Sequence, residues 1–226
     1  MDIDFKAPVD HIAITIWAVN SFRAYETADQ YRGQGVPVIM GGPHTYFYSD
    51  EAKEHCDAVG IGEGEKIWAL MLEEVVRGRP KKIYRADHLQ DLKNLPLPPY
   101  DLLNPGKYGL FKTFSIQSSR GCPFKCEFCS ERFYLGPRYR YRPIEEVIDE
   151  INRSKAKNVL FAGSNFAGKI PHTMELMEAL ILLKVRWSTL WSAYLCNNEK
   201  FLDLAKKSGL LHVNIGIESI NQDTLS

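Results

Sequence analysis

The chain alternates short apolar runs with helical stretches, and it does so in two separate series. Such alternation is typical of β/α units, in which helices cover a sheet of parallel strands. The first series predicts strands at residues 11–17, 36–42 and around Val59 to Ile61, with helices at 20–35 and from Glu65 onward. The second series predicts strands at 114–119, 158–163, 185–195 and 211–219, and helices at 142–155, 171–184 and 197–209. The fold class is therefore predicted to be α/β.

A proline-rich segment separates the two series. The stretch LPLPPYDLLNP carries four of the 12 prolines of the chain, and proline removes backbone donors and favours extended segments. We therefore predict a partial flavodoxin-like or Rossmann-like domain over residues 1–80 and a linker over 81–113. Residues 114–226 are predicted to form a partial β/α TIM-like barrel, because four strands and three helices make up half or more of one.

Charge and composition exclude several kinds of partner. Lys plus Arg and Asp plus Glu are 28 each, so no basic face attracts nucleic acid, and we expect no nucleic-acid partner. No secretory signal is visible, and no run reaches the roughly 18 apolar residues of a membrane span. We expect a cytoplasmic protein. In that reducing compartment five cysteines indicate metal ligands or reactive thiols rather than disulfides.

Three of the cysteines, Cys122, Cys126 and Cys129, follow a C-x3-C-x2-C spacing. A buried helical stripe would have this spacing, but Gly121 and Pro123 favour a turn after a strand. Zinc normally takes four ligands in two pairs, and neither Cys56, Cys196 nor a histidine has a spacing that completes such a pattern. An iron–sulfur cluster usually takes four thiolates, so three leave one iron open to a small molecule. The cluster is the preferred interpretation, and zinc is the alternative.

The motif CPFKCEFC, within SIQSSRGCPFKCEFCSERFYLGPRYRYRPIEEVIDEI, resembles the signature of the radical S-adenosylmethionine (SAM) superfamily, and in particular its cobalamin-binding subgroup. GGPHTYFYSDEAKEHCDAVGIGEGE resembles the latter half of the subgroup's cobalamin-binding domain, and LHVNIGIESIN resembles its fourth barrel strand. The resemblance implies a chain truncated at both ends, with a partial cobalamin-binding-type domain followed by a partial radical SAM barrel. It also implies that Cys122, Cys126 and Cys129 hold a 4Fe-4S cluster whose fourth iron binds SAM.

The resemblance assigns further residues to SAM. Phe128 would place its backbone against the adenine. Ser164 and Asn165 would contact the amino group of the methionine, although many subgroup members carry two acidic residues where Gly163 and Ser164 stand here. A strand-end turn is the alternative for these positions. Glu218 would bind the ribose hydroxyls or the methionine end, and a structural ion pair is the alternative.

The resemblance also assigns residues of the first domain to cobalamin. Gly41 and Gly42 in GGPH, and Glu63 and Gly64 in GIGEGE, would lie against its tail, with structural turns as the alternative. The subgroup's axial-histidine pattern, D-x-H-x-x-G, has no match in the sequence. His44 and His55 are alternative ligands, and a solvated or capping histidine is the commoner case.

Two aromatic stretches have simpler interpretations. RYRYRP places three arginines around two tyrosines, and we expect these arginines to bridge the cysteine loop to carboxylates or to a cofactor rather than to bind RNA. Trp187 and Trp191 lie four apart in a predicted strand, hence on one face, and are expected to serve the packing of the barrel rather than to form a substrate platform.

The predicted reaction follows from the resemblance. The enzyme would cleave SAM reductively to a 5′-deoxyadenosyl radical and transfer a methyl group through cobalamin to an unactivated carbon. The alternatives are radical oxidation or ring closure without methyl transfer, and a non-catalytic fragment that binds a cluster or zinc. The implied partners are a small-molecule or lipid-like substrate and an external electron donor such as flavodoxin or ferredoxin.

Overall fold

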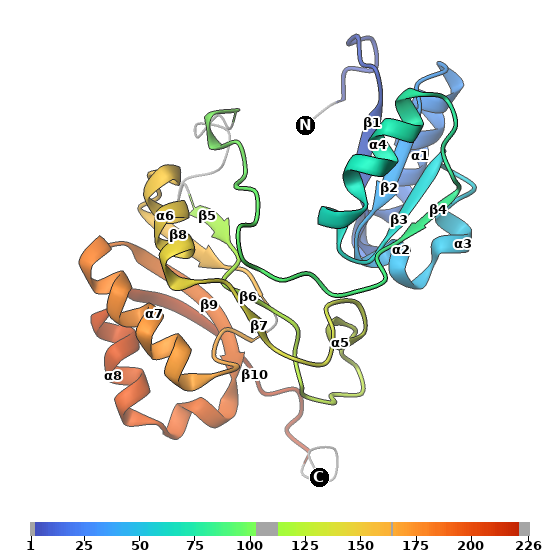
Figure 1. The fold of residues 1–226 in the computed structure, drawn as a ribbon. Coiled ribbons are helices and arrows are strands. Elements are labelled where there is room, and N and C mark those ends of the chain that lie inside the picture. Colours follow the sequence, from blue (N-terminus) through green and yellow to red (C-terminus); the bar gives the residue numbers. More distant parts are fainter. Residues whose placement is uncertain (1–2, 103–112, 164, 222–226) are drawn as a thin grey trace. The chain divides into compact units, whose positions relative to one another are not determined.

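The computed structural model of the chain describes residues 3–102, 113–163 and 165–221. It divides into two compact units, Met1–Gln90 and Asp91–Ser226 (Figure 1). Among the described residues, no helix combines the length and the apolar character that crossing a bilayer requires. Each unit has its own sheet and its own core.

Unit 1 contains a four-stranded sheet in the order β1-β2-β3-β4. All neighbouring strands are parallel. The strands are β1 (Ile12–Thr15), β2 (Val38–Gly41), β3 (Ala58–Ile61) and β4 (Ile83–Arg85). The helices are α1 (Ser21–Gly33), α2 (Pro43–Phe47), α3 (Ser49–Ala52) and α4 (Trp68–Val76), with single turns η1 (Ala18–Asn20) and η2 (Gly64–Lys66).

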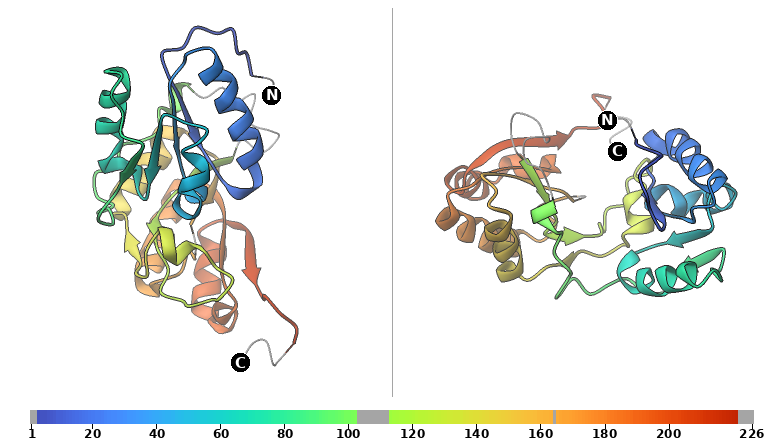
Figure 2. Two further views of the ribbon diagram at one scale, coloured as in Figure 1. Left: turned by 90° about the vertical axis from the view of Figure 1, so that its right-hand side faces the viewer. Right: turned by 90° about the horizontal axis from the view of Figure 1, so that it is seen from above.

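Strand β2 is buried on both faces. Val38 and Met40 pack into the cluster that contains Ala24 and Ala28 of α1, whereas Ile39 packs into the cluster with Met71 of α4. Figure 2 shows α1 and α4 on opposite faces of this sheet. A parallel sheet covered on both faces requires continuous apolar runs, which explains the VPVIM sequence of this strand.

Unit 2 contains a four-stranded parallel sheet in the order β10-β9-β8-β5. Its strands are β5 (Thr113–Ile116), β8 (Asn158–Phe161), β9 (Arg186–Ser192) and β10 (Leu210–Gly216). Helices α6 (Ile144–Ser154), α7 (Ile170–Leu183) and α8 (Glu199–Lys207) cover one face (Figure 1). The remaining elements are η3 (Tyr100–Leu102), α5 (Glu131–Tyr134), η5 (Ala193–Asn197) and an antiparallel ribbon of β6 (Ser119–Arg120) and β7 (Arg140–Tyr141).

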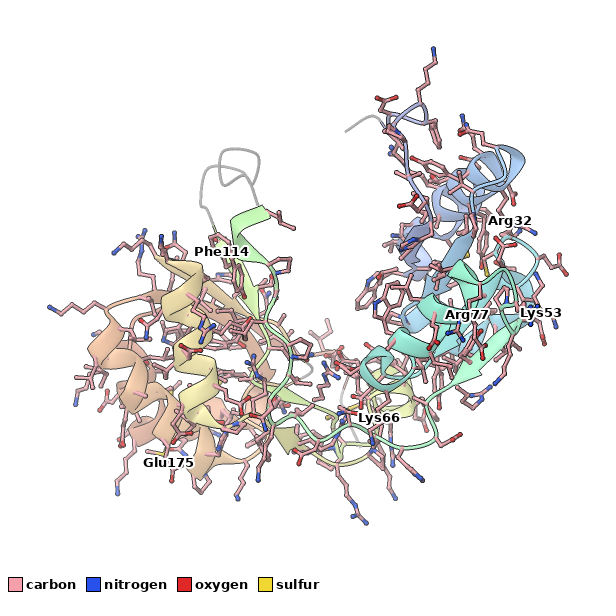
Figure 3. The ribbon with its side chains drawn as sticks, turned by 45° about the horizontal axis from the view of Figure 1, so that its top comes forward. Arg32, Lys53, Lys66, Arg77, Phe114 and Glu175 are labelled. Atoms are coloured by element: carbon pink, nitrogen blue, oxygen red, sulfur yellow. The ribbon has the colours of Figure 1, made fainter. Side chains whose placement is uncertain are left out.

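The core of unit 2 lies between this sheet and its helices. Trp187 and Trp191 are 0% and 2% exposed and belong to its apolar cluster, so the prediction that both pack internally is confirmed. Helix α6 contributes Val147 and Ile151 to the same cluster, as its apolar spacing predicts. Phe114 on β5, labelled in Figure 3, lies at the margin of this core and meets the ring of Tyr100 edge-on at 5.8 Å.

The predicted α/β class is confirmed, and the differences are local. Residues 81–90 were expected in the linker, but β4 pairs with β3 there and extends the first sheet, so unit 1 ends at Gln90. The strand expected at 114–119 divides: β5 ends at Ile116, and Ser119 and Arg120 pair with β7 instead. The strand expected at 185–195 ends at Ser192, where η5 begins.

Candidate metal centre

The cysteine loop is closed at its base by a short ribbon. Ser119 pairs with Tyr141, and Arg120 pairs with Arg140. Within the loop, the amide of Cys122 donates to the carbonyl of Gly136 at 3.1 Å, and the amide of Cys129 donates to the carbonyl of Cys126 at 3.1 Å. The three cysteines thus lie on one loop whose ends are held together by backbone hydrogen bonds.

Gly121 makes this closure possible. Its φ of +85° lies in the left-handed region, where residues with a Cβ are strained. A Cβ there would overlap the carbonyl oxygen of Arg138 and would lie 3.0 Å from those of Gly136 and Leu135. The loop therefore requires glycine directly before Cys122, for both its conformation and its packing.

All five cysteines of the chain are free thiols. Cys122 is buried, Cys129 is partly exposed and Cys126 is exposed. Within the described ranges, no group of three His, Cys, Asp or Glu side chains forms a ready-made metal site. The structure thus places the three predicted ligands on one loop without converging their sulfur atoms. Thiolates are nevertheless the donors that an iron–sulfur cluster takes, and three free thiols would hold three of its four irons.

Several aromatic side chains lie on the cysteine loop and on the segments beside it, and one of them contacts Cys122. The hydroxyl of Tyr139 lies 3.6 Å from Cys122 Sγ. Burial, and then the hydrogen bond to Cys122, raises the pKa of Tyr139 well above its usual range. Tyr194 packs edge-on against Phe124 at 6.2 Å, and Tyr141 packs on His172 at 4.6 Å. Burial raises the pKa of Tyr141 to about 12, so these phenols are neutral at ordinary pH.

The arginines of RYRYRP hold the loop and its base. Arg140 Nη2 donates to the carbonyl of Leu135 at 2.7 Å. Arg142 Nη1 donates to the carbonyl of Gln117 at 2.9 Å and forms an ion pair with Glu150. Both side chains of that pair are 4% exposed. The expectation that an arginine of this stretch binds a carboxylate is confirmed for Arg142.

The residues predicted to bind SAM have different environments. Phe128 is 69% exposed. Asn165 is buried, and its amide donates to Ser192 Oγ at 2.8 Å while its Oδ1 accepts from the amide of Ala167 at 3.3 Å. Asn165 therefore joins the loop after β8 to the end of β9. Ser164 lies outside the described residues.

Glu218 follows β10 and is exposed. Its φ of +67° is unusual for a residue with a side chain. The carboxylate lies over the α-carbon of Gly216, where any Cβ would meet its Oε1 atom. A ligand role for Glu218 stays a prediction, and the structure adds that its side chain folds back on the strand end.

The residues predicted to face cobalamin end two neighbouring strands of unit 1. Gly42 has a φ of +107°, and a Cβ there would lie 2.8 Å from the carbonyl oxygen of Ile16. Gly41 and Gly64 have more room, with Gly60 O at 3.8 Å from a Cβ on the first and nothing within 4 Å of the second. Glu63 is buried and accepts the amide of Gln90. These contacts explain Gly42 and Glu63 structurally, and a cofactor role stays a prediction for all four.

The two alternative histidines both have protein partners. His44 Nε2 lies 3.0 Å from the hydroxyl of Tyr25, and its side chain is 8% exposed. His55 Nδ1 lies 2.8 Å from Asp29 Oδ2, and its ring stacks on Tyr25 at 4.3 Å. Nearby, Arg32 of α1, labelled in Figure 3, donates to the carbonyl of Glu54 at 2.9 Å. The His44 contact ties α1 to α2, and the His55 and Arg32 contacts tie α1 to the segment between α3 and β3.

Two residues near Cys122 were not predicted from the sequence. The sequence indicates Tyr139 only as part of RYRYRP, and it gives no sign of Gly168. Their proximity depends on the β6–β7 ribbon, which brings the end of the loop back to its beginning. One sequence signal indicates that the chain comes back to the start of the loop. It is the alternation of arginine and tyrosine in RYRYRP, which follows the cysteines along the chain.

The radical SAM superfamily model matches residues 116–226, which include the whole cysteine loop. Residues 116–226 of the chain belong to the radical SAM superfamily. Members of the superfamily use a 4Fe-4S cluster and SAM, and the three thiols of the loop fit that cluster in number and chemistry.

Two of the known proteins similar to this chain are methyltransferases of one organism. Bacteriochlorophyllide d C-12(1)-methyltransferase of Chlorobaculum tepidum is 33% identical over 224 residues, which cover 96% of this chain and 49% of that protein. Bacteriochlorophyllide d C-8(2)-methyltransferase of the same organism is 29% identical over 240 residues, which cover 99% of this chain and 53% of that protein.

A solved structure has the same fold. The radical SAM methyltransferase TsrM from Kitasatospora setae, with cobalamin and a 4Fe-4S cluster bound, matches with a TM-score of 0.76 at 19% identity. The match covers 98% of this chain and 52% of TsrM. The chain spans about half the length of the relatives it matches.

Proposed function

We propose that the protein containing this chain cleaves SAM reductively at a 4Fe-4S cluster and transfers a methyl group through cobalamin to an unactivated carbon. The observation that carries the proposal is the loop of three free thiols, Cys122, Cys126 and Cys129, within the segment that matches the superfamily. When bound, the cluster supplies the electron for cleavage of the carbon–sulfur bond of SAM.

The three cysteines of the loop would hold the cluster from different environments. Cys122 is buried at the base of the loop, where Gly121 and the ribbon fix its backbone. Cys126 is exposed, so its thiol is accessible when iron and sulfide enter. The fourth coordination position would be left to the methionine end of SAM, because the loop supplies three thiols.

Four residues would position SAM around that iron. Phe128 precedes the last cysteine and would lie against the adenine. Asn165 and Ser164 follow β8 and would accept hydrogen bonds from the methionine ammonium, and neutral acceptors bind a cation less strongly than carboxylates. Glu218 follows β10 and would bind the ribose or the methionine end.

Unit 1 would bind the cobalamin tail. Gly41 ends β2 and Gly42 follows it, and Glu63 and Gly64 follow β3. All four therefore lie at the carboxyl edge of a parallel sheet, where open α/β sheets bind ligands. The methyltransferase names of the relatives and the cobalamin in the TsrM structure support this assignment. We further propose a cytoplasmic protein with a small-molecule or lipid-like substrate and an external donor such as flavodoxin or ferredoxin.

Anaerobic reconstitution tests the cluster. The chain should bind iron and sulfide with a broad brown absorbance, and the reduced protein should convert SAM to 5′-deoxyadenosine. Cys126→Ala should lose both properties. Cys196→Ala is the matched control, because Cys196 is also exposed but lies outside the loop. A colourless protein with stoichiometric zinc would reject the proposal.

Gel filtration with cobalamin tests the methyl-transfer half of the proposal. Cobalamin should co-elute with the chain, and product analysis with the full-length protein should show a methylated substrate. Formation of 5′-deoxyadenosine without cobalamin retention would instead favour radical oxidation or ring closure.

A further inference from the structure

The hydroxyl of Tyr139 is directed at the sulfur of Cys122. The two atoms lie 3.6 Å apart, within hydrogen-bonding distance for sulfur. Cys122 is the buried member of the three cysteines, and Tyr139 immediately precedes β7, the strand that closes the loop. A contact between residues 17 positions apart in the sequence is therefore fixed by the ribbon at the base of the loop.

Gly168 provides the space that the Tyr139 ring occupies. A Cβ at residue 168 would overlap Cε1, Cζ and Cε2 of Tyr139, the ring carbons nearest the hydroxyl. The ring thus lies directly on the backbone of the turn between β8 and α7. Two separate features, the ribbon and this glycine, determine where the hydroxyl points.

Neighbouring tyrosines are directed elsewhere. The hydroxyl of Tyr194 donates to the carbonyl of Ala167 at 3.3 Å. The ring of Tyr141 packs on His172, and its centroid lies 6.1 Å from that of Tyr139. Tyr139 is therefore the tyrosine whose geometry fits a bond to the cysteine sulfur.

We propose that Tyr139 is a positioning residue that donates a hydrogen bond to the Cys122 thiolate in the cluster-loaded protein. This inference rests on the proposed function, which makes Cys122 a cluster ligand. A ligated thiolate carries no proton and can only accept, whereas a neutral phenol has one hydrogen to donate. Donors to ligand sulfur stabilise the more negative, reduced cluster and so raise its reduction potential.

Tyr139→Phe tests the bond with least disturbance, because the ring can remain on Gly168 while the hydroxyl is lost. After anaerobic reconstitution and a check of equal iron and sulfide content, the midpoint potential is measured by a spectroscopic redox titration. The variant should have a more negative potential than the wild type. Tyr141→Phe is the matched control and should keep the wild-type potential.

Gly168→Ala provides a second, independent variant. It retains the hydroxyl but displaces the ring, so its potential should also become more negative, and it is titrated in place of Tyr139→Phe if that protein loads too little cluster. An unchanged potential in the variant titrated overturns the inference. If the wild type assembles a cluster, that outcome leaves the proposed function standing. A wild-type chain that assembles no 4Fe-4S cluster overturns both.

Discussion

Gly121 is a residue of the cysteine loop at which a side chain is expected to be costly. In Gly121→Ala, the new Cβ would meet the carbonyl of Arg138 and the backbone would be held at a positive φ. We expect the free energy of unfolding of unit 2 to fall by about 2–5 kcal/mol, from backbone strain and overpacking together. Urea denaturation measures the change, and iron loading should fall with it.

Gly163→Ala is the matched control for Gly121→Ala. A Cβ on Gly163 would lie 3.5 Å from the carbonyl oxygen of Ser119, an ordinary contact. The control should therefore change stability by less than about 1 kcal/mol. Equal losses in the two variants would show that the closure of the loop does not depend on Gly121.

At the scale of single residues, sequence reasoning works where chemistry depends on local spacing. The C-x3-C-x2-C motif indicated the ligands, and the Gly121–Pro123 context indicated a turn. It could not indicate that Tyr139 reaches Cys122, because that contact depends on a two-residue ribbon. The sequence also could not distinguish a glycine that leaves space for a ligand from a glycine that packs against the backbone. Gly42 is of the second kind, because it packs on the backbone of Ile16.

At the scale of elements, a buried ion pair joins α6 to the base of the cysteine loop. Glu150 on α6 forms the pair with Arg142 and also accepts the hydroxyl of Tyr100 from η3. Glu150→Ala would leave the Arg142 charge buried without its carboxylate. We expect unit 2 to lose about 3–5 kcal/mol of stability, measured by urea denaturation.

Asp149→Ala on the same helix is the control for the buried pair. Asp149 pairs with Arg153 at 2.8 Å, and both side chains are more than half exposed. An exposed i,i+4 pair contributes less than about 1 kcal/mol. If Glu150→Ala costs no more than Asp149→Ala, the pair does not stabilise the junction between α6 and the ribbon.

Helix α7 should make the stability of unit 2 depend on pH. Burial lowers the pKa of His172, and Lys169 adds to this effect, while Glu175 and Glu145 oppose it. The unfolded histidine binds a proton near pH 6.5, whereas the folded one stays neutral to lower pH. The contribution of His172 to the free energy of unfolding is therefore complete above about pH 6.5, and it is lost as the pH falls through the pKa of the folded state.

His172→Gln should reduce this pH dependence. Unfolding measured between about pH 7.5 and 5 should show a smaller loss of stability in the variant than in the wild type, because glutamine does not titrate. Parallel curves for the two proteins would contradict a buried, neutral His172.

The elements themselves were predictable where periodicity is long. Helix α6 has several turns with Val147 and Ile151 on one face, and it was predicted nearly to its ends. Strand β4 has only three residues, Ile83–Arg85. The residues on either side of it are mostly polar, so no apolar pattern marks the strand in the sequence. The β6–β7 ribbon is shorter still, so pairing between distant segments, rather than local pattern, defines it.

At the scale of the whole molecule, two cores predict two unfolding transitions. Unit 1 and unit 2 have separate apolar clusters, so calorimetry of the chain should resolve two events. Loading with iron and sulfide should raise the melting temperature of one transition only, because a ligand stabilises the unit that binds it. Hydrogen exchange should assign that transition to unit 2.

A single transition that shifts as a whole on loading would contradict this independence. The two-part organisation itself was predictable, because the β/α alternation is interrupted by a cluster of prolines. The position of the boundary between the units was less predictable. Unit 1 ends at Gln90 rather than at residue 80, because β4 completes the first sheet.

The double burial of β2 has a consequence for how the chain can vary. Val38, Ile39 and Met40 are each at most 3% exposed. A polar substitution at any of these three positions would therefore place a polar side chain in the core. Random substitution followed by selection for folded chains should therefore leave three consecutive apolar positions in this strand.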